Sequence, residues 1–81
     1  MSKSLTENIK DYSDCKILYT LLKPHSPHTI VFVEDRVDPW FVHVITYKTK
    51  SGIVSDTSMI IAADIKTWKG HLEALGHTEK K

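Results

Sequence analysis

Five histidines and one cysteine are the side chains of this sequence that are best suited to binding a metal ion. His25 and His28 form an H-x-x-H pair, and Cys15 with His43 or His71 could complete a zinc site with them. Structural zinc sites usually draw on several thiolates at short paired spacings, whereas this chain has a single thiol. We therefore expect no metal site and no cofactor, and we expect Cys15 to be buried and inert.

Covalent or acid–base catalysis finds little support in the sequence. There is no G-x-S-x-G elbow and no glycine-rich phosphate loop, because the three glycines are isolated. The carboxylates of Glu34, Asp35 and Asp38 are clustered, but Arg36 stands among them, which favours a solvated loop with local ion pairs. We expect a protein that is not an enzyme.

Four lysines form a candidate phosphate-binding surface. Lys48 and Lys50 flank a predicted hairpin turn, and Lys66 and Lys69 lie on the polar side of a predicted C-terminal helix. If the hairpin folds toward the start of that helix, the four ammonium groups form one patch that could bind nucleic acid. The alternative is that these lysines only keep the surface soluble.

The stretch PWFVHVITYKT, residues 39–49, is the element around which we expect the fold to be organised. Side chains alternate between the two faces of a strand, and this stretch is apolar on both alternating sets. One set contains Trp40 and the other contains Phe41, His43 and Tyr47. This pattern predicts a central strand covered on both faces.

Two further strands and a helix follow from similar patterns. Residues 29–34 (TIVFVE) and 53–61 (IVSDTSMII) are rich in strand-forming residues, and Gly52 permits a tight hairpin turn before the second of them. Asp64 is a candidate N-cap for a C-terminal helix with Ile65, Trp68, Leu72 and Leu75 on one stripe, and Gly76 suits its C-terminus.

The N-terminal region predicts a helix from about Leu5 to Leu22. Ser4 to Glu7 matches a capping box, apolar residues recur at spacings of three and four, and Pro24 supplies a stop. The alternative is that residues 11–14 (DYSD) form a turn and residues 16–23 (KILYTLLK) form a fourth strand.

These elements predict a small α+β domain, a three-stranded antiparallel β-meander flanked by an N-terminal and a C-terminal helix. The order α–β–β–β–α is also that of double-stranded-RNA-binding domains. The likeness is one of topology alone, because ADIKTWKG at the start of the last helix lacks their lysine cluster and no glycine-rich turn precedes it.

Two short helices can cover one face of such a sheet and would leave the other face exposed. An exposed apolar face of that kind usually marks a contact with a partner, and Trp40, Phe41, His43 and Tyr47 are the residues we expect to make it. The alternative is that one helix crosses to the second face and that these side chains are core.

Length and composition point to one ordinary globular domain over residues 1–81, with an ordered core of about residues 4–76 and short polar tails. The net charge of +1 excludes the strong basic excess typical of dedicated DNA-binding domains. The N-terminus has no apolar signal-peptide core, and no run approaches the ~18 apolar residues that span a bilayer, so we expect a cytoplasmic protein without membrane association.

The sequence therefore favours a non-catalytic interaction or regulatory module, an inhibitor or adaptor. We expect its partner to be another protein or a second copy of the chain in a homodimer, and we see no small-molecule substrate. The alternative function is nucleic-acid binding through Lys48, Lys50, Lys66 and Lys69.

Overall fold

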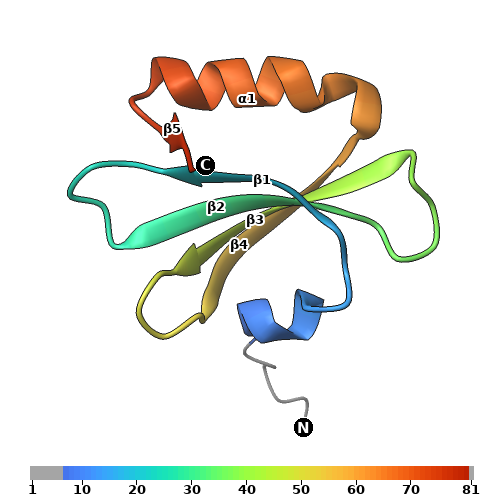
Figure 1. Cartoon of the computed structure of the whole chain (residues 1–81), viewed down its shortest axis with the longest axis horizontal. Coiled ribbons are helices and arrows are strands. Elements are labelled where there is room, and N and C mark those ends of the chain that lie inside the picture. The colour runs from blue at the N-terminus through green and yellow to red at the C-terminus, as the bar shows by residue number, and fades with distance from the viewer. Residues whose placement is uncertain (1–6, 81) are drawn as a thin grey trace, which may run out of the picture.

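The computed structural model describes residues 7–80 as a five-stranded antiparallel sheet with a single α-helix (Figure 1). Along the sheet the strands lie in the order β4-β3-β2-β1-β5, so that consecutive strands from β1 to β4 are neighbours. The elements in chain order are the 3-10 helix η1 (Ile9–Tyr12), β1 (Ile17–Leu22), β2 (His28–Glu34), β3 (Phe41–Lys48), β4 (Val54–Ile61), the 3-10 helix η2 (Ala62–Asp64), α1 (Ile65–Ala74) and β5 (Thr78–Glu79).

The predicted fold, three strands flanked by two helices, is wrong. The three expected strands are present as β2, β3 and β4 and pair antiparallel as a meander, but β1 and β5 extend the sheet beyond β2. The central strand is accordingly β2 and not the stretch at residues 39–49, which forms the next strand, β3. With five strands and one α-helix, the topological likeness to double-stranded-RNA-binding domains also disappears.

The N-terminal helix from Leu5 to Leu22 is replaced by η1, a turn and β1. Ser4 and Leu5 lie outside the described residues, and η1 has its own capping box, in which Asn8 and Asp11 exchange backbone and side-chain hydrogen bonds. A β-bulge between Ile17 and Tyr19 interrupts the alternation of β1. Because a bulge shifts the side chains by one position, the apolar spacing of this strand imitates a helical stripe.

The C-terminal helix is confirmed, but it is oriented differently from the predicted stripe. Ile65 and Leu72 pack against the sheet, whereas Trp68 is 37% exposed and Leu75 is 54% exposed. Gly76 follows the helix with a φ of 105°, in the left-handed region expected there. The segment after it, predicted to be a polar tail, supplies β5, which pairs with the end of β1.

The core lies on both faces of β2. On the face covered by α1 the buried cluster is Leu21, Ile30, Phe32, Val42, Val44 and Ile60. On the opposite face it is Cys15, Val31, Val33 and Ile45, against which Ile9 and Tyr12 pack. We call residues 7–14, which include η1, the N-terminal segment. Figure 1 shows α1 on one side of the sheet and η1 on the other. The N-terminal segment therefore performs the covering role that we assigned to a second helix.

The β3–β4 hairpin depends on Gly52, as the sequence predicts. Gly52 has a φ of 78°, and its carbonyl accepts a hydrogen bond from Ile9 N at 2.8 Å. A Cβ at this position would lie 2.9 Å from Asn8 Oδ1. The hairpin turn and the N-terminal segment are thus in contact at a place where only glycine fits.

We expect Gly52→Ala to destabilise the fold by about 1–3 kcal/mol, because alanine is strained at this φ and its methyl group would displace Asn8. Gly70→Ala is the matched control. It lies within α1, where no described atom beyond those of the adjacent residues and the helix's own backbone comes within 4 Å of the new Cβ, so alanine should stabilise the protein by about 1 kcal/mol. Thermal unfolding measures both changes, and a neutral Gly52→Ala would contradict the account of the hairpin.

Candidate functional site

On and beside the β3–β4 pair at one end of the sheet, Trp40, Met59 and Ile61 are exposed apolar side chains, and Phe41 beside them is half-buried; we call these four residues the apolar strip. Trp40 is 71% exposed, Met59 61% and Ile61 47%. In the sheet Phe41 pairs with Ile61, and His43 pairs with Met59. The apolar strip therefore extends over the start of β3 and the second half of β4.

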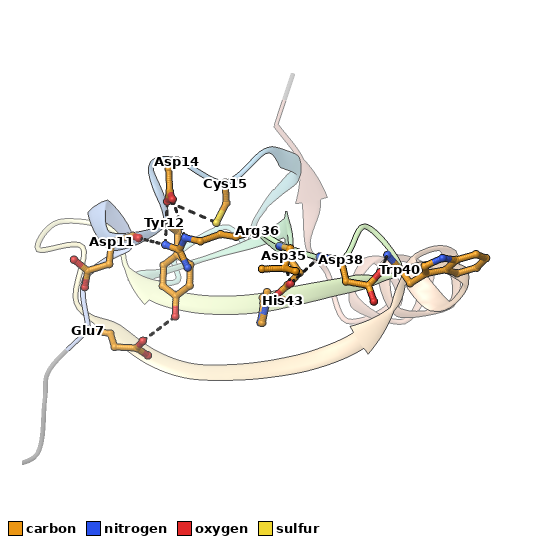
Figure 2. A network of polar contacts seen from close by, with 11 residues as sticks. Glu7, Asp11, Tyr12, Asp14, Cys15, Asp35, Arg36, Asp38, Trp40 and His43 are labelled. Atoms are coloured by element: carbon orange, nitrogen blue, oxygen red, sulfur yellow. Dashed lines mark hydrogen bonds and ion pairs between the residues drawn. The ribbon is translucent and has the colours of Figure 1, made fainter.

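The structure separates the four residues that were predicted to bind a partner. Phe41, His43 and Tyr47 share one face of β3, as expected, but Tyr47 packs into the cluster beneath the N-terminal segment. Phe41 and His43 lie beyond that segment and are partly exposed. Trp40 precedes the strand, and its indole extends away from the polar contacts around it (Figure 2).

The outer edge of β4 is open next to the apolar strip. At its beginning the N-terminal segment pairs with it, since Asn8 forms a bridge with Ile53 and Val54 N donates to Glu7 O at 2.8 Å. Within residues 7–80 no strand pairs with the remainder of this edge. Proteins usually protect such an edge with charges or prolines, but β4 (VSDTSMII) has only Asp56, and its last five residues have neither.

Arg36 holds the N-terminal segment against the sheet (Figure 2). Its guanidinium forms hydrogen bonds with the Asp14 carboxylate at 2.7 and 2.9 Å and donates to the Asp11 carbonyl. It also lies 5.6 Å from the centroid of the Tyr12 ring. This contact lowers the pKa of the Asp14 carboxyl, because the hydrogen bond from Arg36 favours its ionised form.

Tyr12 adds a second attachment of the same segment. Its hydroxyl donates to Glu7 Oε2 at 2.9 Å. Burial, followed by this hydrogen bond and by the Glu7 charge, raises the Tyr12 pKa to about 12. A raised tyrosine pKa favours the neutral form in the fold, so this contribution to stability is present below pH 10 and is lost as the pH rises toward 12.

An aspartate–histidine pair orders the loop that presents Trp40. Asp35 Oδ1 lies 2.7 Å from His43 Nε2, and Asp35 Oδ2 accepts hydrogen bonds from the amides of Val37 and Asp38, both at 3.1 Å. Trp40 N in turn donates to Asp38 Oδ1 at 2.9 Å. The hydrogen bond from His43 and those from the two amides lower the pKa of Asp35 to about 2.

The Asp35 pKa can be tested directly. We expect the carboxyl carbon of Asp35 to titrate at about pH 2 in an NMR experiment, and His43→Leu should raise this pKa toward 3.8. His71→Leu, at an exposed position on α1, is the control and should leave it unchanged. The ionised Asp35 stabilises the fold above its ordinary pKa, so that the contribution is lost as the pH falls from about 4 to about 2. A value near 3.8 in the native chain would contradict the pairing.

The four lysines of the predicted phosphate-binding surface do not come together. Lys48 and Lys50 lie at the β3–β4 hairpin, whereas Lys66 is at the start of α1, near the Trp40 end of the sheet, where Ala62 N donates to Trp40 O. The length of β3, roughly 25 Å, separates these two ends. Lys69 forms an ion pair with Glu79 at 2.6 Å and lies over the Tyr19 ring.

Lys48 and Lys50 instead line an open groove together with Lys23, which the sequence analysis did not single out. The groove has a volume of about 1050 Å³. It lies between the β1–β2 loop and the β3–β4 hairpin, which Figure 1 shows at the same end of the sheet. Only the pairing of β2 with both of its neighbours brings residues 23 and 48 together.

The residues considered for metal binding and nucleophilic chemistry are dispersed. In the part of the chain that the structure describes, no three side chains of histidine, cysteine, aspartate or glutamate are arranged to hold a metal ion. Cys15 is 9% exposed, packs beside Val31 and Val33, and has a pKa raised by burial. Its thiol is therefore protonated at neutral pH and is a weak nucleophile.

No family model, curated protein or solved structure matches this chain. Among residues 7–80, no helix combines the length and the apolar character required to cross a bilayer. The site residues that sequence reasoning missed are Met59, Ile61 and Lys23. The sequence did contain a signal for the first two, because the apolar end of β4 (MII) follows a polar middle. Arg36 was expected to pair with the neighbouring carboxylates, whereas it pairs with Asp14.

Proposed function

We propose that this chain is a non-catalytic protein-interaction module, of the inhibitor or adaptor type, that works as a homodimer assembled through β4. The observation that carries the proposal is the open edge of β4 directly beside the apolar strip. An open edge offers unpaired backbone N–H and C=O groups to another strand, and the exposed apolar side chains supply area that a partner can bury.

A second copy of the chain is a suitable occupant of this edge. In an antiparallel arrangement with Met59 at the two-fold axis, Thr57 of each copy would pair with Ile61 of the other. The only charged residue of β4, Asp56, would then lie opposite Ala62, so that like charges do not meet. A two-fold axis also brings both apolar strips to the same interface, as a closed dimer requires.

The site supports binding better than catalysis. The hydrogen bonds of His43 within residues 7–80 join its ring only to Asp35, and no serine, threonine or cysteine is bonded to the pair as a nucleophile would be. Trp40 is held by its backbone on two sides, through Asp38 and Ala62, while its indole is exposed. A rigidly presented exposed tryptophan is typical of an interface anchor.

Met59→Lys should dissociate the dimer, because a lysine on an edge strand opposes strand pairing. We expect sedimentation equilibrium to give twice the 9.3 kDa of one chain for the native protein and an at least about tenfold higher dimer dissociation constant for the variant. Leu75→Lys is the matched control, because Leu75 is similarly exposed, at 54%, but lies at the end of α1. This control should remain dimeric.

Trp40→Ala separates an interface role from a core role. Because Trp40 is 71% exposed, its removal should cost little stability in dilute, monomeric protein while it weakens association. Two outcomes would refute the proposal. One is a native chain that remains monomeric up to about 1 mM, where even a weak dimer is populated; the other is equal weakening by Met59→Lys and Leu75→Lys.

A further inference from the structure

The groove at the hairpin end of the sheet has walls that are fixed before any ligand arrives. Thr49 N donates to Pro27 O at 2.9 Å, and the hydroxyl oxygens of Thr29 and Thr49 are 2.6 Å apart. These contacts tie the β3–β4 hairpin to the β1–β2 loop. In that loop Ser26 N donates to Lys23 O at 3.1 Å and closes a turn around Pro24 and His25.

His25 has a φ of 65°, in the left-handed region that favours glycine. A residue other than glycine in this region costs free energy, which the surrounding structure must supply. The loop therefore has one defined shape, set by a proline on each side of His25 and by its contact with Thr49. A preformed wall reduces the entropy that a ligand must overcome on binding.

The lining of the groove combines cationic and apolar groups. Lys23, Lys48 and Lys50 contribute the positive charges, and no carboxylate of the described residues lines it. The carboxylate of Glu79, which follows the lining residue Thr78, is already paired with Lys69. The apolar part of the lining comes from Leu22, Pro24, Pro27 and Ile53.

We propose that this groove binds a small amphiphilic carboxylate, an anion with an extended apolar chain. The ammonium groups would hold the carboxylate, and the apolar lining would remove the chain from water. The volume of about 1050 Å³ lies just above the range, roughly 300–1,000 Å³, that is usual for small-molecule sites. This proposal is independent of dimer formation, since the groove lies at the end of β4 opposite to Met59 and Ile61.

Two other anionic ligands fit the groove less well. Single-stranded nucleic acid is usually held by bases stacked on several aromatic rings, whereas among residues 7–80 the groove is lined by one imidazole, that of His28, and by no tyrosine, tryptophan or phenylalanine. A small inorganic anion would use the lysines but leave the apolar lining in water. A ligand with both a carboxylate and an apolar chain contacts the lysines and the apolar lining at the same time.

The test is a titration of the full chain with decanoate, followed by NMR and calorimetry. Acetate carries the same carboxylate without the chain, and decyltrimethylammonium carries the same chain with the opposite charge. We expect saturable binding of decanoate, with amide shifts centred on residues 22–28 and 48–53, and at least tenfold weaker binding of both controls. Binding should weaken with added salt, because the lysines are exposed.

Variants locate the site. The double variant Lys48→Gln with Lys50→Gln should weaken decanoate binding at least tenfold, whereas Lys10→Gln with Lys66→Gln removes the same charge elsewhere and should have no effect. Lys23 is left unchanged in both variants because its side chain also extends toward the end of α1, where its Cε would lie 3.7 Å from a Cβ placed on Gly76. All four residues are exposed, so that both variants should fold.

Four results would overturn the proposal. Equal binding of acetate and decanoate would show a site for charge alone, and equal binding of decyltrimethylammonium would show an apolar surface without charge selection. Equal loss in the two double variants would show a diffuse electrostatic effect. Tighter binding of a single-stranded oligonucleotide than of decanoate, lost in the Lys48/Lys50 variant, would assign the groove to nucleic acid instead.

Discussion

The burial of β2 on both faces is the constraint on which the rest of this structure depends. Five consecutive residues, from Thr29 to Val33, are buried, so that each face of the sheet requires a cover. The helix α1 covers one face by packing Ile65 and Leu72 against it. The other face is covered by the N-terminal segment, whose only regular structure is one 3-10 turn. Because this cover is smaller than α1, it determines which part of the sheet is left exposed.

The N-terminal segment is too short to cover its whole face. It is fixed at one end by Gly52 and Val54 and at the other by Arg36, and between these points it lies over Val31, Val33 and Ile45. The sheet beyond it, where β3 and β4 reach the Trp40 end, has no such cover among the described residues. The apolar strip and the open edge of β4 are therefore consequences of the same limited coverage.

The two ends of the sheet differ in chemistry. At the Trp40 end the loop is ordered by carboxylate contacts, those of Asp35 and Asp38, and it exposes the Trp40 indole beside an apolar edge. At the hairpin end the loops are joined through Thr49, and lysines line a groove without a nearby free carboxylate in the described chain. Because β3 and β4 separate these ends, the proposed dimer and the proposed ligand would occupy different ends of the molecule.

The sequence by itself determined the strands at β2, β3 and β4, the turn at Gly52 and the C-terminal helix, because alternation, glycine and helix periodicity are local signals. It did not determine β1. The turn at residues 13–14 is stabilised by Arg36, more than twenty residues away, and the bulge between Ile17 and Tyr19 gives a strand the spacing of a helix. The alternative of a turn at DYSD with a fourth strand was the correct reading of this region, but nothing local favoured it.

Some features of the candidate sites were likewise visible in the sequence, whereas others came only from the tertiary structure. Trp40 and Phe41 were visible as aromatic residues at the start of a strand, and Lys48 and Lys50 as a basic hairpin. Only the tertiary structure decided that Tyr47 is covered, that Lys69 is paired with Glu79, and that Lys23 joins Lys48 across the sheet. The physical reason is that strand pairing and face coverage are set by contacts between distant segments, whereas a sequence pattern reports only on neighbouring residues.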